Sequence, residues 1–121
     1  MAKNHVNDGD VVDYTNAGTA LASGDPVVIG NQIGVALVSI ANGATGSVAM
    51  SKVWNLPKAD AAVIAVGEKV LFDSSAGNFD DSLATPAAGD VSGCCVAMES
   101  KGVTVGETIA VKLNVGVGTV T

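Results

Sequence analysis

The residue types that carry most enzymatic chemistry are few and scattered in this sequence. His5 is the only histidine, and it lies in a polar N-terminal stretch. A general base needs an orienting partner and a pocket, and the sequence around His5 predicts neither. The chain contains no arginine, which excludes an arginine clamp on a phosphate or carboxylate. We therefore interpret His5 as an exposed histidine.

Two acidic stretches come closest to a cation site. Asp8, Asp10 and Asp13 lie close together, but they lack the central glycine and the closing glutamate of a calcium loop. The stretch Asp73–Asp81 is richer in oxygen ligands, yet its Gly77 stands at the fifth position instead of the sixth. An acidic hairpin tip is favoured there over a calcium site, and we predict no metal.

Other catalytic templates also fail. No serine lies in a Gly-x-Ser-x-Gly elbow, and the glycine-rich stretch Gly43–Ser47 has no lysine that would make it a phosphate loop. Gly116-Val117-Gly118 lacks the third glycine and the following helix of a dinucleotide site. We predict that the protein is not an enzyme and holds no cofactor.

The two cysteines, Cys94 and Cys95, are adjacent, so they cannot build a disulfide framework. Neighbours on a strand point to opposite faces, and a vicinal disulfide needs an unusual backbone geometry. We expect two reduced thiols that serve packing, with a redox or metal role as the weaker alternative.

Length and charge bound the remaining possibilities. The 121 residues suffice for one domain with a proper core, and 48% of them are hydrophobic. The net charge of -6 and the lack of clustered lysines argue against a nucleic-acid partner. No apolar run approaches the roughly 20 residues that span a bilayer, and residues 1–5 lack the apolar stretch of a signal peptide. We expect neither membrane insertion nor classical secretion.

Valine-rich runs bounded by glycine and asparagine predict an all-β fold. Short, evenly spaced strands favour a small single-domain barrel or sandwich. The stretch Pro57–Val66 is either a helical turn or a loop. The predicted strands are Asp10–Thr15, Pro26–Gly30, Gly34–Ile40, Ser47–Val53, Lys69–Asp73, Gly93–Glu99 and Thr108–Asn114.

The chain carries a weak internal repeat, which predicts two similar halves. Residues 20–50 match residues 63–113 in the order of apolar, glycine and acidic positions, with an insertion of about Ser74–Ser92 in the second copy. Glycine followed by an acid recurs at strand entrances, where we expect the glycine to turn and the acid to stay solvated. We predict an extended N-terminal arm over residues 1–12 and a single β domain over residues 13–121.

Three features suggest contacts between copies. Trp54 is either a core residue or an interface anchor, since tryptophan is enriched in interaction hot spots. The C-terminal stretch with Val115, Val117 and Val120 is apolar and β-prone, so we expect it to be docked in its own sheet or in a neighbour's. The small side chains of the core also favour association, because they bury less area per residue. We predict a homo-oligomer.

The order of several motifs resembles one family. The start Met1–Asn4 with Asp8-Gly9-Asp10, the stretches Ala20–Gly30, Gly34–Leu37 and Ala41–Val48, and the run Val53–Lys58 are similar to the tailed-phage capsid cement, or decoration, proteins. That family is often mislabelled as a predicted recombinase. The absent phosphate loop and the negative charge argue independently against that label.

The resemblance implies a structural virion protein on the outer capsid surface, made in the bacterial host cytoplasm. It implies trimers at three-fold and quasi-three-fold sites that bridge major capsid proteins and stabilise the expanded shell. The arm residues that would bind the capsid are Met1, Ala2, Lys3, Asn4, His5, Val6 and Asn7. The alternative function is a virion-surface module that binds a receptor or glycan through loops such as Ser74–Asp81.

Overall fold

A computed structural model describes residues 3–4 and 6–121, and these residues form β structure without a helix. The strands are β1 (Val11–Thr15), β2 (Pro26–Ile29), β3 (Gln32–Ala36), β4 (Thr45–Ala49), β5 (Val53–Pro57), β6 (Lys69–Asp73), β7 (Asn78–Asp80), β8 (Val91–Ala97), β9 (Thr108–Lys112) and β10 (Thr119–Val120).

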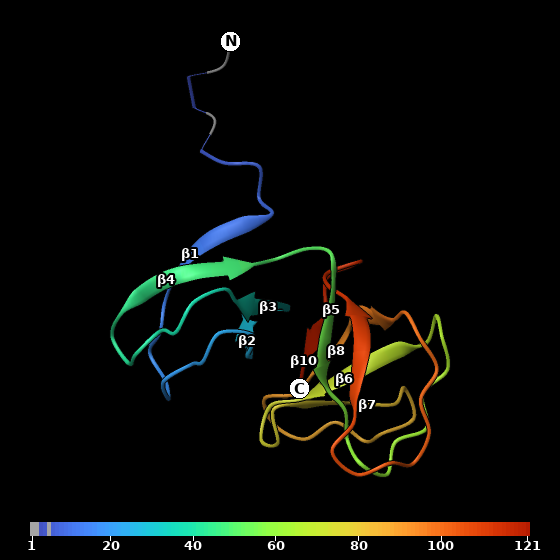
Figure 1. The fold of residues 1–121 in the computed structure, drawn as a ribbon. Coiled ribbons are helices and arrows are strands. Elements are labelled where there is room, and N and C mark those ends of the chain that lie inside the picture. The colour runs from blue at the N-terminus through green and yellow to red at the C-terminus, as the bar shows by residue number, and fades with distance from the viewer. Residues whose placement is uncertain (1–2, 5) are drawn as a thin grey trace.

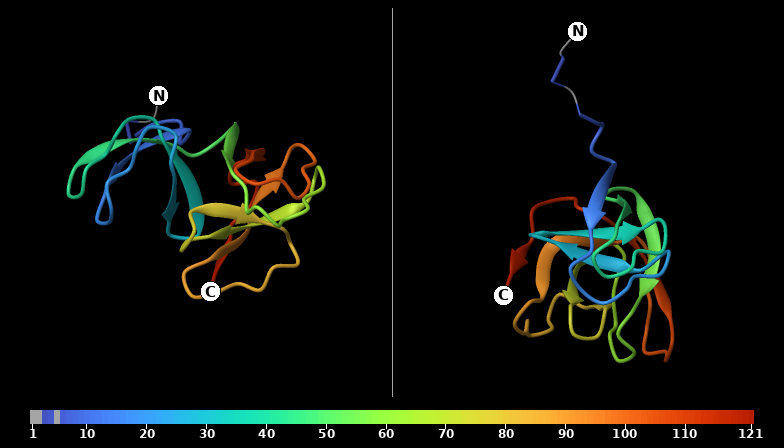
Figure 2. Two further views of the ribbon diagram at one scale, coloured as in Figure 1. Left: turned by 60° about the horizontal axis from the view of Figure 1, so that its bottom comes forward. Right: turned by 90° about the vertical axis from the view of Figure 1, so that its left-hand side faces the viewer.

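The strands form two antiparallel sheets that follow one another along the chain (Figure 1). The first sheet has the order β1-β4-β3-β2, and the second has the order β5-β9-β8-β6-β7, with β10 added beside β8. The all-β prediction is confirmed. Neither sheet closes into a barrel, so the structure agrees with the sandwich alternative and not with the barrel. We call the parts built on these sheets the first and second lobes (Figure 2).

All seven predicted strands coincide with strands of the structure, although most boundaries shift by a few residues. Strands β5 and β7 were missed, and for β10 the sequence predicted only that the C-terminal stretch is docked in a sheet. β5 contains a polar asparagine and ends in proline, while β7 and β10 are only three and two residues long. The stretch Pro57–Val66 is a loop: Pro57 completes β5, and one turn closed by the bond from Ala62 N to Ala59 O at 3.1 Å follows, without a helix. Short strands carry little periodicity, so sequence patterns detect them poorly.

The two lobes share one strand order, since β1, β4, β3 and β2 correspond to β5, β9, β8 and β6. Hydrogen bonds between backbone atoms also correspond. Gly24 N donates to Ala36 O, and Gly67 N donates to Ala97 O, both at 2.7 Å. These correspondences fit the repeat that the sequence predicts, and we propose that the lobes are two copies of one ancestral unit.

The acids that follow the turn glycines are structural groups. Asp25 accepts a hydrogen bond from the backbone N–H of Ala22 at 2.9 Å, and Asp90 accepts one from Ala87 at the same distance. Asp90 is buried and also accepts bonds from the backbone and hydroxyl of Ser74. The expectation of a solvated acid is therefore wrong for Asp90, because its carboxylate pins the turn that leads into β8.

The core consists of a larger cluster under the second sheet and a smaller one under the first. The smaller cluster has Ala36, Ile40 and Val48 at its centre. Two β3 residues, Ile33 and Val35, belong to the larger cluster. Strand β3 thus contributes to both clusters, and this sharing joins the lobes through apolar packing.

Asparagine side chains add a polar connection between the lobes. Asn114, which follows β9, accepts a hydrogen bond from Ile33 N at 3.1 Å and donates to Ile33 O at 2.8 Å. Its amide also donates to Met50 O at 2.7 Å. Asn31 and Gly118 exchange two further bonds, at 2.8 and 2.9 Å. Asn114 and Asn31 therefore attach β3 to the C-terminal part of the chain.

Candidate functional site

The N-terminal arm leads away from the first sheet into open space (Figures 1 and 2). Its described residues Lys3, Asn4, Val6 and Asn7 are exposed, Val6 at 89%. Met1, Ala2 and His5 lie outside the described residues. Strand β1 begins at Val11, so the last two residues of the range 1–12 pair with β4 in the sheet. The arm proper ends at Asp10.

A small apolar hollow of about 180 Å³ lies where the arm meets the lobes. Trp54 is half-buried there, and its indole N–H donates to Ser51 O at 2.7 Å. The Ser51 hydroxyl in turn donates to the Asp10 carboxylate at 3.0 Å. Trp54 also packs against the larger core cluster. Trp54 thus connects the core to the base of the arm, with one part of its ring accessible.

The C-terminal valines do not lie at the hollow that contains Trp54. Strand β10 pairs with β8 of its own sheet, which is one of the two placements that the sequence predicts. Val115, Val117 and Val120 stay exposed at 49%, 78% and 42%. Val117 lines a different hollow from Trp54. Trp54 and Val117 therefore belong to separate surface features.

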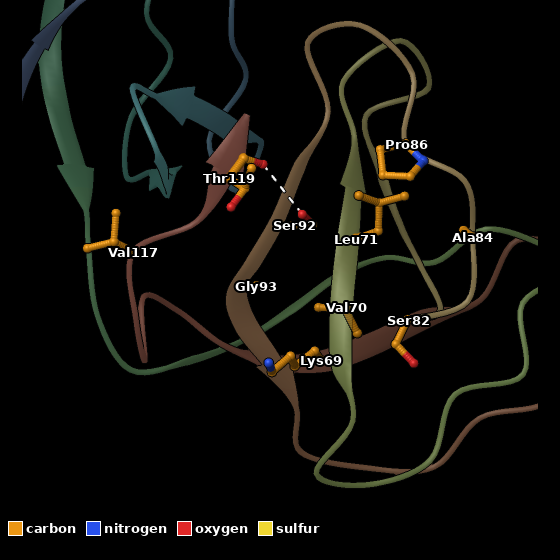
Figure 3. A pocket seen from close by; sticks show the side chains of 10 residues that line it. All are labelled: Lys69, Val70, Leu71, Ser82, Ala84, Pro86, Ser92, Gly93, Val117 and Thr119. Atoms are coloured by element: carbon orange, nitrogen blue, oxygen red, sulfur yellow. Dashed lines mark hydrogen bonds between the residues drawn. The ribbon is translucent and has the colours of Figure 1, made fainter. Parts of the chain in front are cut away.

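The larger hollow is open to solvent and has a volume of about 460 Å³ (Figure 3). The insertion lines one side of it with Ser82, Ala84 and Pro86, and β6 and β8 line others. Lys69 and the hydroxyls of Ser82, Ser92 and Thr119 are its polar groups. The volume suits a small ligand, but aromatic residues, which commonly line such sites, are absent from its lining.

Four exposed valines of the second lobe were missed by the sequence analysis. Val63 and Val66 lie beside the segment that carries Val103 and Val105, because Ile64 and Lys101 form a bridge. Their exposures range from 60% to 82%. The internal repeat could have revealed these valines. In the first lobe, the positions equivalent to Val63 and Val66 are Ala20 and Ser23, which are also exposed. Larger apolar side chains at these exposed positions thus distinguish the second lobe.

The cysteine side chains do not point apart as expected. The Sγ atoms of Cys94 and Cys95 are 3.1 Å apart, and both residues are buried. An irregularity in β8 is the cause, because Gly93 and Cys94 are two extra residues between the pairs Val70–Cys95 and Leu71–Ser92. The hydrogen bond to Cys95, together with burial, raises the pKa of the Cys94 thiol above its ordinary range. Both thiols are free in this structure.

The stretch Asp73–Asp81 forms the hairpin of β6 and β7, as the favoured interpretation predicted. Asp73 accepts hydrogen bonds from the Ser75 hydroxyl at 2.7 Å and from the backbone of Ser75 and Ala76. These bonds, with the hydroxyl bond first, lower the pKa of Asp73 despite some opposing desolvation. Asp73 therefore holds the turn.

Across residues 3–4 and 6–121, His, Cys, Asp and Glu side chains form no group of three or more that could hold a metal ion. The same residues include no helix long and apolar enough to cross a membrane.

Lys58 is the most deeply buried lysine and lies just after β5. Only 3% of it is exposed, and its ammonium donates to the carbonyls of Ala59 at 2.6 Å and Ala62 at 2.8 Å. Both acceptors belong to the loop that follows β5. A buried charge is costly unless such bonds compensate it, so Lys58 fixes the course of this loop.

Comparison with known proteins identifies the family. No curated protein and no solved structure matches the chain. A family model described as phage cement protein matches residues 6–113, which include strands β1 to β9 and part of the arm. This family implies a structural component of the phage capsid and not an enzyme. The exposed residues of the arm are compatible with that role. The chain belongs to the phage cement protein family.

Proposed function

We propose that the protein decorates the outer capsid surface and stabilises the expanded shell by bridging major capsid subunits. The exposed N-terminal arm carries this proposal. Residues 6–10 are exposed, and the arm extends beyond the body of its own subunit (Figure 1). An arm of this kind contacts a neighbouring protein without rearranging the lobes. The residues proposed to bind the capsid are Met1, Ala2, Lys3, Asn4, His5, Val6 and Asn7.

Clustering of several copies makes modest contacts effective. We propose a trimer at three-fold and quasi-three-fold sites, in which each copy places its arm on a different capsid subunit. When one arm has bound, the others bind from a high effective concentration, so the cluster dissociates slowly. Candidate contacts between copies are Trp54, Val115, Val117 and Val120, which offer partly exposed apolar surface.

Stabilisation of the shell follows from linkage. A ligand that binds one of two states stabilises that state by an amount that grows with the ratio of ligand concentration to the dissociation constant. Capsid subunits change their relative positions when a shell expands, so a cluster fitted to the expanded spacing binds the unexpanded shell poorly. Binding therefore favours the expanded form, and the total effect grows with the number of occupied sites.

Co-sedimentation tests the proposal directly. The purified protein is mixed with expanded capsids that lack it, and with unexpanded shells of the same phage. We expect saturable binding to expanded shells and at least tenfold weaker binding to unexpanded ones. A variant without residues 1–8 keeps Asp10, whose carbonyl bonds to Met50 N, and therefore keeps β1 in place. We expect this variant to fold normally and to bind poorly.

A variant with a scrambled sequence over residues 1–8 is the matched control for arm length and composition. Equal occupancy by the wild type, the deletion and the scrambled variant would contradict the arm mechanism. Equal binding to both kinds of shell would contradict stabilisation of the expanded form. A receptor- or glycan-binding module stays the alternative prediction, to be pursued if no shell binds the protein.

A further inference from the structure

The adjacent cysteines of β8 have a geometry that ordinary strand neighbours lack. Their Sγ atoms are 3.1 Å apart because β8 carries two extra residues opposite Val70 and Leu71. Gly93, directly before the pair, has a φ of 84°, a value that L side chains rarely adopt. This left-handed residue turns the strand just before the two thiols, and the thiols meet on one side.

We propose that Cys94 and Cys95 are a redox site, which forms a vicinal disulfide when the protein meets a small-molecule disulfide and opens again when thiols are in excess. The Sγ atoms must approach from 3.1 Å to about 2.05 Å, a movement of roughly 1 Å. Both sulfur atoms are already in contact, so neither cysteine has to be brought in from another part of the fold.

The reaction is a two-step thiol–disulfide exchange. The thiolate of one cysteine attacks a sulfur of the small disulfide, forms a mixed disulfide and releases one small thiolate. The second cysteine loses its proton and attacks the protein sulfur of that mixed disulfide. The internal S–S bond forms, the mixed S–S bond breaks, and a second small thiolate leaves. The two cysteines lose two electrons and two protons, and the small disulfide gains them.

Covalent geometry makes the bond easy to reduce. Disulfide-linked residues usually have Cα atoms about 4.4–6.8 Å apart, whereas neighbours across a trans peptide are about 3.8 Å apart. The ring closed by adjacent cysteines is therefore strained, and strained disulfides are the labile ones. We expect the pair to be reduced in a thiol-rich cytoplasm and oxidised outside it, the compartment change that the proposed virion role would entail.

The C-terminal segment 115–121 lies against Cys94, and we infer that it controls access to the pair. Val115 N donates to Cys94 O at 2.8 Å, and Gly118 lies against the side of Cys94. A Cβ on Gly118 would lie 3.1 Å from Cys94 Cβ and 2.8 Å from the backbone oxygen of Asn31. The close fit at Gly118 keeps solvent from Cys94. An oxidant therefore reaches the thiols when this segment opens.

Mass spectrometry of the full chain tests the proposal. Reduced protein is incubated with excess oxidised glutathione at neutral pH, quenched in acid, denatured and alkylated with N-ethylmaleimide. We expect a monomer that has lost two hydrogen atoms and carries no maleimide. Dithiothreitol should restore two alkylated cysteines. The variant Cys95→Ser should stop at the mixed disulfide with glutathione.

Two alkylated cysteines after prolonged oxidation would overturn the proposal, as would a stable glutathione adduct on the wild type or a disulfide-linked dimer. Access is tested with Gly118→Ala, which displaces the covering segment, and with Gly116→Ala as control. A Cβ on Gly116 meets only Gly93 O at an ordinary 3.7 Å. We expect Gly118→Ala to be oxidised at least fivefold faster than the wild type. Gly116→Ala should be oxidised at the rate of the wild type. Equal rates in all three would refute access through this segment.

Discussion

The Asn114 side chain takes the place of a missing strand residue beside β3. Pairing between β3 and β4 begins at Val35, so Ile33 has no β4 partner on that side. The Asn114 amide fills this position, because it accepts from Ile33 N and donates to Ile33 O as a peptide group would. Its third bond, to Met50 O, ties down the end of β4. We therefore expect Asn114 to be a major support of the contact between lobes.

The loss of unfolding free energy on replacing Asn114 can be estimated from these bonds and from its backbone conformation. Each bond contributes roughly 1 kcal/mol net, so removing the amide should cost about 3 kcal/mol. Asn114 also has a φ of 52°, in the left-handed region. There asparagine is tolerated, whereas alanine costs roughly 1 kcal/mol more. Asn114→Ala should thus lower the free energy of unfolding by about 4 kcal/mol, and Asn114→Gly by about 3 kcal/mol.

Urea unfolding followed by fluorescence measures both values, since Trp54 is the only tryptophan and is half-buried. The matched control is Asn55→Ala, which changes an exposed asparagine of β5. Surface substitutions of this kind usually change stability by less than about 0.5 kcal/mol. If Asn114→Gly were as stable as the wild type, the inference that the amide supports the lobe contact would be refuted.

Three further predictions concern single positions. Lys58→Met should destabilise the fold by about 2 kcal/mol in thermal or urea unfolding, because two loop carbonyls lose their buried donor. Gly34→Ala should cost about 1–3 kcal/mol by calorimetry, since its Cβ would overlap the Val48 side chain, whereas Gly102→Ala has free space and should be neutral. Asp73 has a lowered pKa, so its stabilising effect is complete above the unfolded value and disappears as pH falls through the folded one. The stability difference between the wild type and Asp73→Asn should therefore shrink on acidification, and a constant difference from neutral to low pH would contradict this assignment.

The sequence predicted the fold class because valine-rich runs between glycines are local signals. It identified β6 with its observed bounds, since Lys69–Asp73 is an apolar run between clear turn residues. It missed β5, whose residues Trp54 and Leu56 are held by pairing with β9, a contact between distant parts of the chain. Local patterns contain no information on such pairing, so the wider architecture needs the tertiary structure.

The candidate site was predicted only in part, for the same reason. The arm was recognisable because residues 1–10 lack apolar periodicity, but its boundary depended on the pairing of Val11 with Ala49. The contact between the two thiols could not be predicted, because it depends on extra residues in β8 opposite β6. Strand register is set by distant segments of the chain. The regular alternation of side-chain directions along one strand therefore predicted, wrongly, that the Cys94 and Cys95 side chains point apart.

The two lobes repeat one topology but carry different additional segments. Both lobes use one strand order, but their cores are joined, because Ile33 and Val35 of β3 belong to the larger cluster. Additions differ between them: the arm precedes β1 of the first lobe, while the insertion and the C-terminal segment belong to the second. Because Asn114 and the shared strand β3 fix the lobes to each other, a force on the arm is transmitted to the second lobe. A protein proposed to bridge capsid subunits needs this rigidity, since a flexible joint between the lobes would let the subunits separate.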